Sequence, residues 1–208
     1  CHNPDTRAMP AQGTRCKPEE ILSEVARYSG FLRAAGGGFT VSGGEPLVQA
    51  PFAMKLFRGA RQLGLHTALD TNGYLGAKLS DEDLADIDLV LLDLKAFDDT
   101  QHRRVTGLGN HAVLEFAERL ATLERPTWIR FVLVPGLTDE PDDMQQLARF
   151  VASLPNVERL EVLPFHQMGR DKWHKLDLHY PLQDKPAATS EQAEAARAVF
   201  LEAGCAVL

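Results

Sequence analysis

Residues 88–95 read DLVLLDLK, and this stretch decides the fold class. Its first half, Leu89 to Leu92, is apolar without a break, which is typical of a strand in a parallel sheet that is covered on both faces. Asp93 and Lys95 stand two residues apart and therefore project from the same face of that strand. An ion pair at a sheet edge would explain them. Because the apolar run predicts burial and a buried unpaired charge is costly, we favour a buried pair or a polar ligand.

Strands and helices alternate along the rest of the chain. Further β-prone runs occur at 39–42, 66–69, 128–134 and 157–163, and amphipathic segments at 18–35, 51–63, 80–85, 98–106, 110–124, 142–153 and after Thr189. Alternation with short connections predicts an α/β fold with a parallel sheet, either closed into a barrel or open. We expect a single domain over residues 1–208, in which 169–188 form an ordered excursion and 205–208 are a candidate last strand.

Composition sets limits on the function. The chain has 208 residues and a net charge of −7 with acidic and basic residues interspersed, which argues against a nucleic-acid partner. It contains no apolar run near the length that a membrane span needs. Three scattered cysteines are too few for a disulfide framework, so a reducing cytoplasm is the expected location. Neither a Gly-x-Gly-x-x-Gly nor a Gly-Lys-Ser/Thr motif supports a nucleotide fold of those types.

Polar or glycine-rich residues occur at the ends of five consecutive predicted strands. Parallel α/β sheets build their sites at the carboxyl ends of strands, so these residues are expected to meet. Chance would supply one or two such ends, because Asp, Asn and Gly end strands well. The five groups are Ser42-Gly43-Gly44-Glu45, Asp70-Thr71-Asn72-Gly73, Asp93-Leu94-Lys95, Arg130 within its strand, and Pro164-Phe165-His166.

Each of these residues also has a purely structural interpretation. Gly43-Gly44 is by default a turn, although paired glycines also let a ligand approach the backbone. Asp70 suits an Asx turn about as well as a ligand site. Arg130 could extend to solvent at a strand end or clamp a substrate, and a lone histidine such as His166 is more often structural than catalytic. We interpret the remaining candidates as structural or bystander groups: His102, His111, His174, His179, Cys16 and Cys205.

Cys1 and His2 open the chain and suggest a metal. A zinc site shared with Cys16 would need a Cys-x14-Cys spacing, which matches no common zinc pattern. An iron–sulfur ligand needs partner cysteines, and none follows nearby.

The ordered set of motifs resembles the radical S-adenosylmethionine superfamily, and within it the activases of glycyl radical enzymes. Gly-Gly-Glu alone would be weak support, whereas stretches that match in order along the whole chain are specific. They are Cys1-His2-Asn3-Pro4-Asp5-Thr6, Ser42-Gly43-Gly44-Glu45, Leu69-Asp70-Thr71-Asn72-Gly73, 88–95, Trp128-Ile129-Arg130, Val134-Pro135-Gly136, and 163–169 with Lys172-Trp173.

The resemblance implies a fold, a partial TIM-like barrel of six βα units. The pattern above accounts for five strands before the candidate terminal one. The family's first strand and most of its cluster loop would precede Cys1, in a segment of roughly 30 residues, the size of one βα unit. The first two cysteines of the Cys-x3-Cys-x2-Cys motif would lie there, and a chain that lacks them is expected to be inactive. Only Cys16 lies in 5–42, which indicates the compact type without a ferredoxin-like insert.

The resemblance also implies roles for individual residues. Cys1 would be the third ligand of a 4Fe–4S cluster. Gly43, Gly44 and Glu45 would meet the amino group of S-adenosylmethionine, and Asp93, Lys95 and His166 its carboxylate and ribose region. Asp70, Thr71 and Asp93 would form a monovalent-cation site, and His2 and Arg130 would hold the substrate peptide.

The implied chemistry is radical generation. One electron from the cluster cleaves S-adenosylmethionine, and the 5′-deoxyadenosyl radical takes hydrogen from a glycine Cα of a glycyl radical enzyme, with pyruvate formate-lyase the favoured partner. A low-potential donor such as flavodoxin or ferredoxin would supply the electron to a cytoplasmic monomer.

Two other hypotheses stay open from the sequence. One is a non-catalytic barrel fragment that retains weak ligand or partner binding. The other is an oxygen-liganded metal or phosphate-binding enzyme that uses Asp70, Asp93 and His166. The second of these lacks a phosphate loop and leaves Cys1-His2-Asn3 unexplained.

Overall fold

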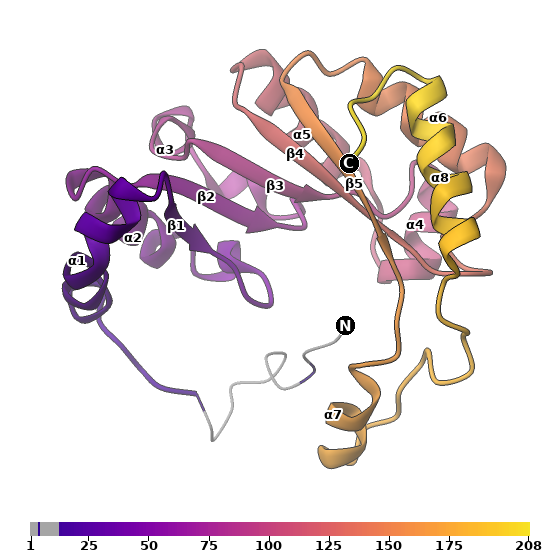
Figure 1. Cartoon of the computed structure of the whole chain (residues 1–208), viewed down its shortest axis with the longest axis horizontal. Coiled ribbons are helices and arrows are strands. Elements are labelled where there is room, and N and C mark those ends of the chain that lie inside the picture. Colours follow the sequence, from indigo (N-terminus) through magenta and orange to yellow (C-terminus); the bar gives the residue numbers. More distant parts are fainter. Residues whose placement is uncertain (1–3, 5–12) are drawn as a thin grey trace.

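Five parallel strands form one sheet in the order β1-β2-β3-β4-β5, so every strand pairs with its neighbours in sequence. The computed structural model describes Pro4 and residues 13–208, and Cys1 and His2 lie outside this part. Figure 1 shows the strands fanning into a curved wall. The strands are β1 (Gly38–Val41), β2 (His66–Thr71), β3 (Leu89–Asp93), β4 (Thr127–Leu133) and β5 (Val157–Pro164).

Helices connect the strands and cover one side of this wall (Figure 1). Each parallel connection needs a crossover, and amphipathic helices supply it. The helices are α1 (Pro18–Ala34), α2 (Ala50–Gln62), α3 (Asp81–Ala85), α4 (Asp99–Thr106), α5 (His111–Thr122), α6 (Pro141–Ala152), α7 (Arg170–Lys175) and α8 (Ser190–Glu202), with short 3₁₀ turns η2 (Pro46–Gln49) and η3 (Gly76–Lys78). The predicted α/β fold with a parallel sheet is confirmed.

Local chemistry explains where several helices begin. Ser80 caps α3 by accepting from Asp83 N, and the Asp83 side chain accepts from Ser80 N in return, which makes a capping box. Thr189 and Gln192 form the same reciprocal arrangement at the start of α8. These exchanges satisfy amide groups that the first helical turn leaves without partners.

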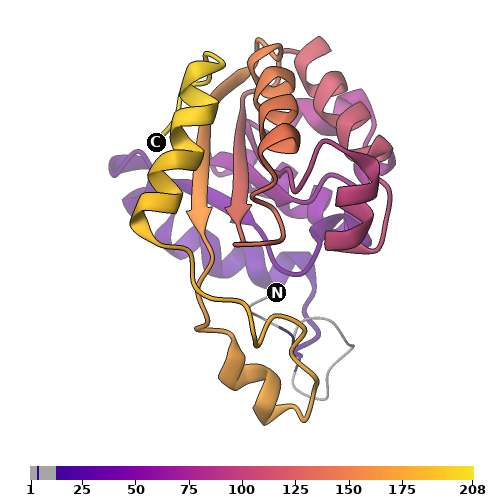
Figure 2. The same ribbon diagram turned by 90° about the vertical axis from the view of Figure 1, so that its right-hand side faces the viewer.

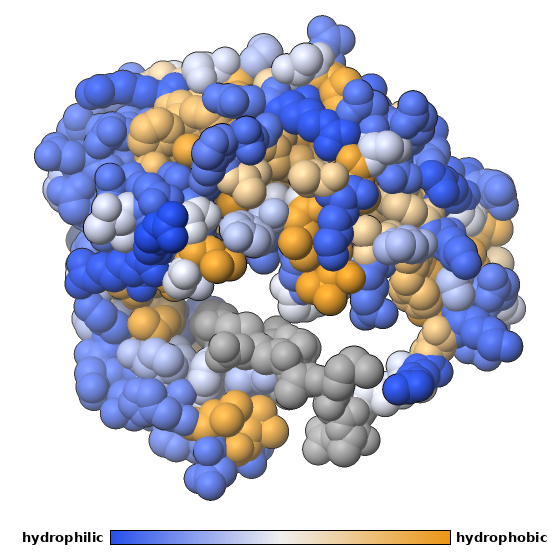
Figure 3. Space-filling model, turned by 180° about the vertical axis from the view of Figure 1, so that it is seen from behind, coloured by the Kyte–Doolittle hydropathy of each residue, from blue (hydrophilic) through white to orange (hydrophobic). Residues whose placement is uncertain are grey.

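The two faces of the sheet differ in burial. Leu69, Leu92 and Ile129 are fully buried and belong to the core that the sheet shares with its helices. On the opposite face Leu91 and Trp128 are only half-buried. The expectation that β3 is covered on both faces is therefore wrong for this second face, because it lines the hollow of the curved wall. Figure 3 shows the molecule hollowed, with hydrophobic side chains along the walls.

Residues 165–189 leave the sheet and return to α8. Phe165, Trp173 and Tyr180 pack with Val134 into a separate small apolar cluster. Gln167 Nε2 donates to Leu182 O at 2.9 Å and ties the two sides of the excursion together. Figure 2 shows α7 beyond the carboxyl ends of β4 and β5, so the excursion stands next to the end of the sheet where a site is expected.

The candidate last strand is not confirmed. Residues 205–208 form an isolated parallel bridge between Val207 and Leu160 rather than a strand. Cys205 nevertheless stays buried beside α6, where its thiol contacts Ala148 O at 3.5 Å. In the described part of the chain, no helix combines the length and the apolar character that crossing a membrane requires.

Candidate functional site

Glu45 fixes the loop that follows β1 to the end of β2. Its Oε1 accepts from Thr71 Oγ1 at 2.8 Å and from Leu47 N at 2.9 Å, and its Oε2 accepts from Asn72 N at 2.9 Å. Gly43, two residues earlier, has φ of 141°, a conformation that favours glycine. Gly43 and Gly44 are exposed, so the loop presents backbone to solvent beside an anchored carboxylate.

A charged network joins the ends of the strands on the half-buried face. Arg130 on β4 forms ion pairs with Asp70 on β2 and, through Nε at 3.3 Å, with Asp93 Oδ1 on β3. Asp70 also accepts from Ser42 Oγ at 2.8 Å, and Lys95 Nζ lies 3.1 Å from Asp93 Oδ2. Asp93 and Lys95 therefore form an ion pair, with side chains that are half-buried rather than fully buried. The whole network contains side chains from four successive strands or from the ends of those strands.

The first of two adjoining cavities lies beside this network and is called the carboxylate cavity, with a volume of about 370 Å³. Two carboxylates, an ammonium group and an imidazole line it, and apolar side chains form the rest of its wall. Its lining residues are Glu45, Val48, Asn72, Tyr74, Leu75, Asp93, Lys95, His102, Thr106, Leu108 and Val113.

The second cavity is larger, about 630 Å³, and is called the aromatic cavity because Phe165, Trp173 and Tyr180 line it. Apolar residues of β4 form another part of its wall, and Arg104 and Lys185 add positive charge. Lys95 and Thr106 line both cavities, so the two adjoin at these residues.

Tyr180 has an unusual position in the aromatic cavity. Its side chain is almost fully buried, and its hydroxyl has no hydrogen-bond partner among the described residues. Burial raises the pKa of the Tyr180 phenol, an effect that Arg170 opposes. The phenol therefore stays protonated and can donate to a bound group. No sequence pattern pointed to Tyr180 beyond its nearness to Lys172-Trp173.

The structure brings some of the predicted site residues together and separates others. Glu45, Asp93 and Lys95 line one cavity. His166 is half-buried, follows the cavity-lining Phe165, and accepts a long hydrogen bond from Met168 N at 3.4 Å. The hydroxyl of Thr71 donates to Glu45 rather than to Asp70.

Asp70 joins Asp93 through the guanidinium of Arg130, which supplies positive charge between the two carboxylates. Within Pro4 and residues 13–208, no group of three or more His, Cys, Asp or Glu side chains is arranged to hold a metal ion. The predicted cluster ligand Cys1 and peptide contact His2 fall outside that part of the chain.

The family is decided by sequence similarity. The family model described as the radical SAM superfamily matches residues 1–151. The chain belongs to the radical SAM superfamily. A curated relative, the pyruvate formate-lyase-activating enzyme of Staphylococcus aureus strain USA300, is 43% identical over 202 residues, covering 94% of this chain and 80% of the relative.

Solved structures support the same assignment. A domain of pyruvate-formate lyase-activating enzyme from Bacteroides vulgatus is 26% identical with a TM-score of 0.68, covering 83% of this chain and 98% of that one. SuiB of Streptococcus suis, solved with its precursor peptide SuiA, has a TM-score of 0.70 at 16% identity, covering 98% of this chain and 44% of that one, and shows the fold alone. The predicted partial TIM-like barrel is confirmed by these neighbours.

Membership settles the class of chemistry. The protein is a radical SAM activating enzyme, and the cofactors of this family are a 4Fe–4S cluster and S-adenosylmethionine. The predicted cofactors are thus confirmed at the level of the family.

Proposed function

We propose that this enzyme activates pyruvate formate-lyase by removing a hydrogen atom from a glycine Cα in a loop of that partner. The similarity to pyruvate formate-lyase-activating enzyme over 94% of the chain carries the proposal. Glycine suits this reaction because it has no side chain to block approach. The junction of the two cavities at Lys95 supports a site for S-adenosylmethionine.

The two cavities match the two ends of S-adenosylmethionine. The amino-acid end carries an amino group and a carboxylate, for which the carboxylate cavity offers Glu45, Asp93 and Lys95. The nucleoside end is flat and largely apolar at its base. The aromatic cavity offers it Val132, Phe165 and the phenol of Tyr180, which has no hydrogen-bond partner among the described residues. Lys95 lies where the two ends would join. The residues present therefore fit this cofactor.

Once bound, the cluster and S-adenosylmethionine supply an organic radical that can take a hydrogen atom from the substrate. The task of this chain is to place the glycine Cα beside that radical and to exclude other C–H groups and water. Glu45 and the Arg130 network act by keeping the loops after β1, β2 and β3 in one arrangement. Lys95 and Asp93 act by contact with the cofactor.

The other predicted roles remain part of the proposal. Cys1 would be a cluster ligand, and His2 and Arg130 would hold the substrate peptide. A monovalent cation beside Asp70 and Asp93 would bind there only together with the Arg130 guanidinium, because that group already contacts both carboxylates. Gly43, Gly44 and His166 would contact the cofactor from the rims of the site.

We also infer the setting in which the enzyme works. The thiols of Cys16 and Cys205 are free, as expected in a reducing cytoplasm. A flavodoxin or ferredoxin would supply the electron, and the enzyme would act as a monomer on its larger partner.

The test is formation of the glycyl radical. The full-length protein that carries the complete Cys-x3-Cys-x2-Cys motif is purified and loaded with its cluster. It is mixed with S-adenosylmethionine, a reductant and pyruvate formate-lyase under anaerobic conditions, and the radical is counted by electron paramagnetic resonance. We expect about one 5′-deoxyadenosine formed per glycyl radical, because one hydrogen atom is transferred each time. Cleavage of S-adenosylmethionine with no radical on pyruvate formate-lyase would refute the partner, and absence of cleavage would refute the activity.

A further inference from the structure

His102 on α4 lines the carboxylate cavity next to the residues assigned to the cofactor. It is only 4% exposed, although the sequence suggested nothing more than a structural histidine. Asp93 and Lys95 line the same cavity. Among the described residues, the hydrogen-bond contacts of this ring involve one of its two nitrogens, Nδ1.

The hydrogen bonds of Nδ1 fix the protonation of the neutral ring. Nδ1 lies 2.8 Å from the carbonyl oxygen of Leu108, and a carbonyl oxygen can only accept. Nδ1 must therefore carry the hydrogen, and Nε2 is left as an unprotonated acceptor. Thr106 Oγ1 lies 3.2 Å from Nδ1 and donates to the carbonyl oxygen of His102, which holds the ring in place.

Nε2 has no hydrogen-bond partner in the part of the chain that the structure describes. Nε2 is not among the fully buried polar atoms without a partner, so it stays accessible, and the ring itself lines the cavity. The backbone at Leu108 and the side chain of Thr106 fully occupy the other nitrogen. A group that enters the cavity is the natural donor for Nε2.

We propose that Nε2 of His102 accepts a hydrogen bond from the amino group of an amino-acid end bound in the carboxylate cavity. Glu45 and Asp93 bring two negative charges to this wall and Lys95 one positive charge, which complements a ligand that carries both an amino group and a carboxylate. A neutral acceptor adds a hydrogen bond there without adding another charge. The ligand class rests on the proposed function, in which it is S-adenosylmethionine.

Two substitutions separate the roles of the two ring nitrogens. His102→Asn keeps a donor near the position of Nδ1 but removes the acceptor at Nε2. His102→Gln places an amide oxygen near the position of Nε2 but loses the contact with Leu108. We expect His102→Asn to weaken binding of S-adenosylmethionine to the cluster-loaded enzyme about tenfold, as for the loss of one hydrogen bond to a charged group. We expect His102→Gln to bind within about threefold of wild type while unfolding at a lower temperature.

The matched control is His111→Asn, which replaces an exposed histidine on α5 that does not line the cavity and should change nothing. Affinities are measured by anaerobic equilibrium dialysis at equal iron content. A second probe, 5′-methylthioadenosine, contains the nucleoside end without the amino acid, so its affinity should not respond to His102→Asn.

The outcomes distinguish this inference from the proposed function. Unchanged affinity of His102→Asn for S-adenosylmethionine would overturn the inference, and so would an equal loss for both probes. If Lys95→Met loses affinity while His102→Asn does not, the proposed site stands and only the role of His102 is refuted. If neither variant loses affinity, the site itself is refuted.

Discussion

Arg130 and Asp70 form an ion pair that joins β4 to β2 across the intervening strand β3. The same guanidinium lies against Asp93 on β3, so one arginine holds two carboxylates that would otherwise repel each other. All three side chains are about one-fifth exposed, which places the network between a surface ion pair and a fully buried one. The network sets the spacing of the strand ends on which the proposed cofactor site is built.

Replacing Arg130 with Gln should leave Asp70 without its ion-pair partner and Asp93 with Lys95 alone. We expect the free energy of unfolding to fall by about 2 kcal/mol, because a partly buried charge pair loses one partner. Urea unfolding at neutral pH measures this loss. Arg149→Gln, which replaces an exposed residue on α6, is the control. If both substitutions lower the free energy of unfolding by the same small amount, the network adds no stability.

Glu45→Gln tests the anchoring of the loop after β1. The glutamate accepts three hydrogen bonds with its two oxygens, and an amide places an NH₂ group against at least one donor. We expect a loss of about 1–3 kcal/mol in unfolding free energy. The exposed Glu118 on α5 offers the matched Glu→Gln control. Equal stability of the two variants would mean that the loop holds its shape without the carboxylate.

Asp143 gives a pH-dependent prediction. Its Oδ1 accepts from the amides of Phe97 and Asp98, and its Oδ2 is buried without a partner in the described chain. Burial raises the pKa of the Asp143 carboxyl despite these two amide hydrogen bonds. The folded protein therefore binds this proton more tightly than the unfolded chain. The stability that the group contributes is complete below its unfolded pKa and is lost as pH rises through the folded value.

Asp143→Asn removes this titration while keeping an acceptor for both amides. The difference in unfolding free energy between Asp143→Asn and wild type should therefore shift in favour of the variant as pH rises from about 4 to 7. Urea unfolding across this range measures it. The neighbouring Asp142 is exposed, so Asp142→Asn should show no such trend. A constant difference for Asp143→Asn would contradict the raised pKa.

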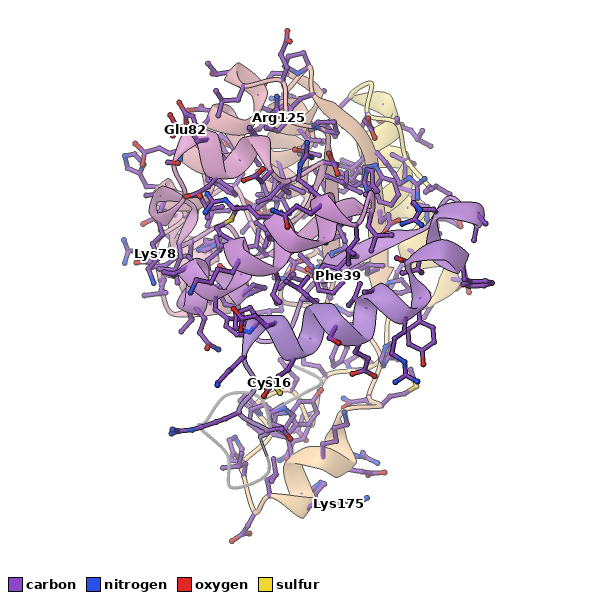
Figure 4. The ribbon with its side chains drawn as sticks, turned by 90° about the vertical axis from the view of Figure 1, so that its left-hand side faces the viewer. Cys16, Phe39, Lys78, Glu82, Arg125 and Lys175 are labelled. Carbon is purple, nitrogen blue, oxygen red and sulfur yellow. The ribbon has the colours of Figure 1, made fainter. Side chains whose placement is uncertain are left out.

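Local patterns in the sequence predicted most of the elements. The apolar run at 89–92 predicted β3, and the amphipathic segment 80–85 predicted α3, because each pattern depends on residues close in sequence. The position of Asp93 beside Lys95 also followed from the two-residue period of a strand. Figure 4 shows Glu82 and Arg125 at the opposite end of the molecule from Lys175, so the loops around α3 and before β4 lie away from the α7 end.

Long-range contacts could not be predicted in the same way. That Arg130 reaches both Asp70 and Asp93 depends on the register of three strands, which no local pattern encodes. The free nitrogen of His102 depends on a carbonyl six residues away in a loop. Residues 205–208 have the composition of a strand, yet they make only one bridge because the chain contacts β5 at a single point.

The central claim is that Lys95, at the junction of the two cavities, binds S-adenosylmethionine. The most direct test is the anaerobic equilibrium affinity of the cluster-loaded Lys95→Met enzyme for S-adenosylmethionine, with Lys175→Met on exposed α7 as the matched control (Figure 4). We predict a loss of about tenfold or more for Lys95→Met at equal iron content, the effect of removing one charged hydrogen bond, and none for Lys175→Met. Equal affinity of the two variants would contradict the site that we propose.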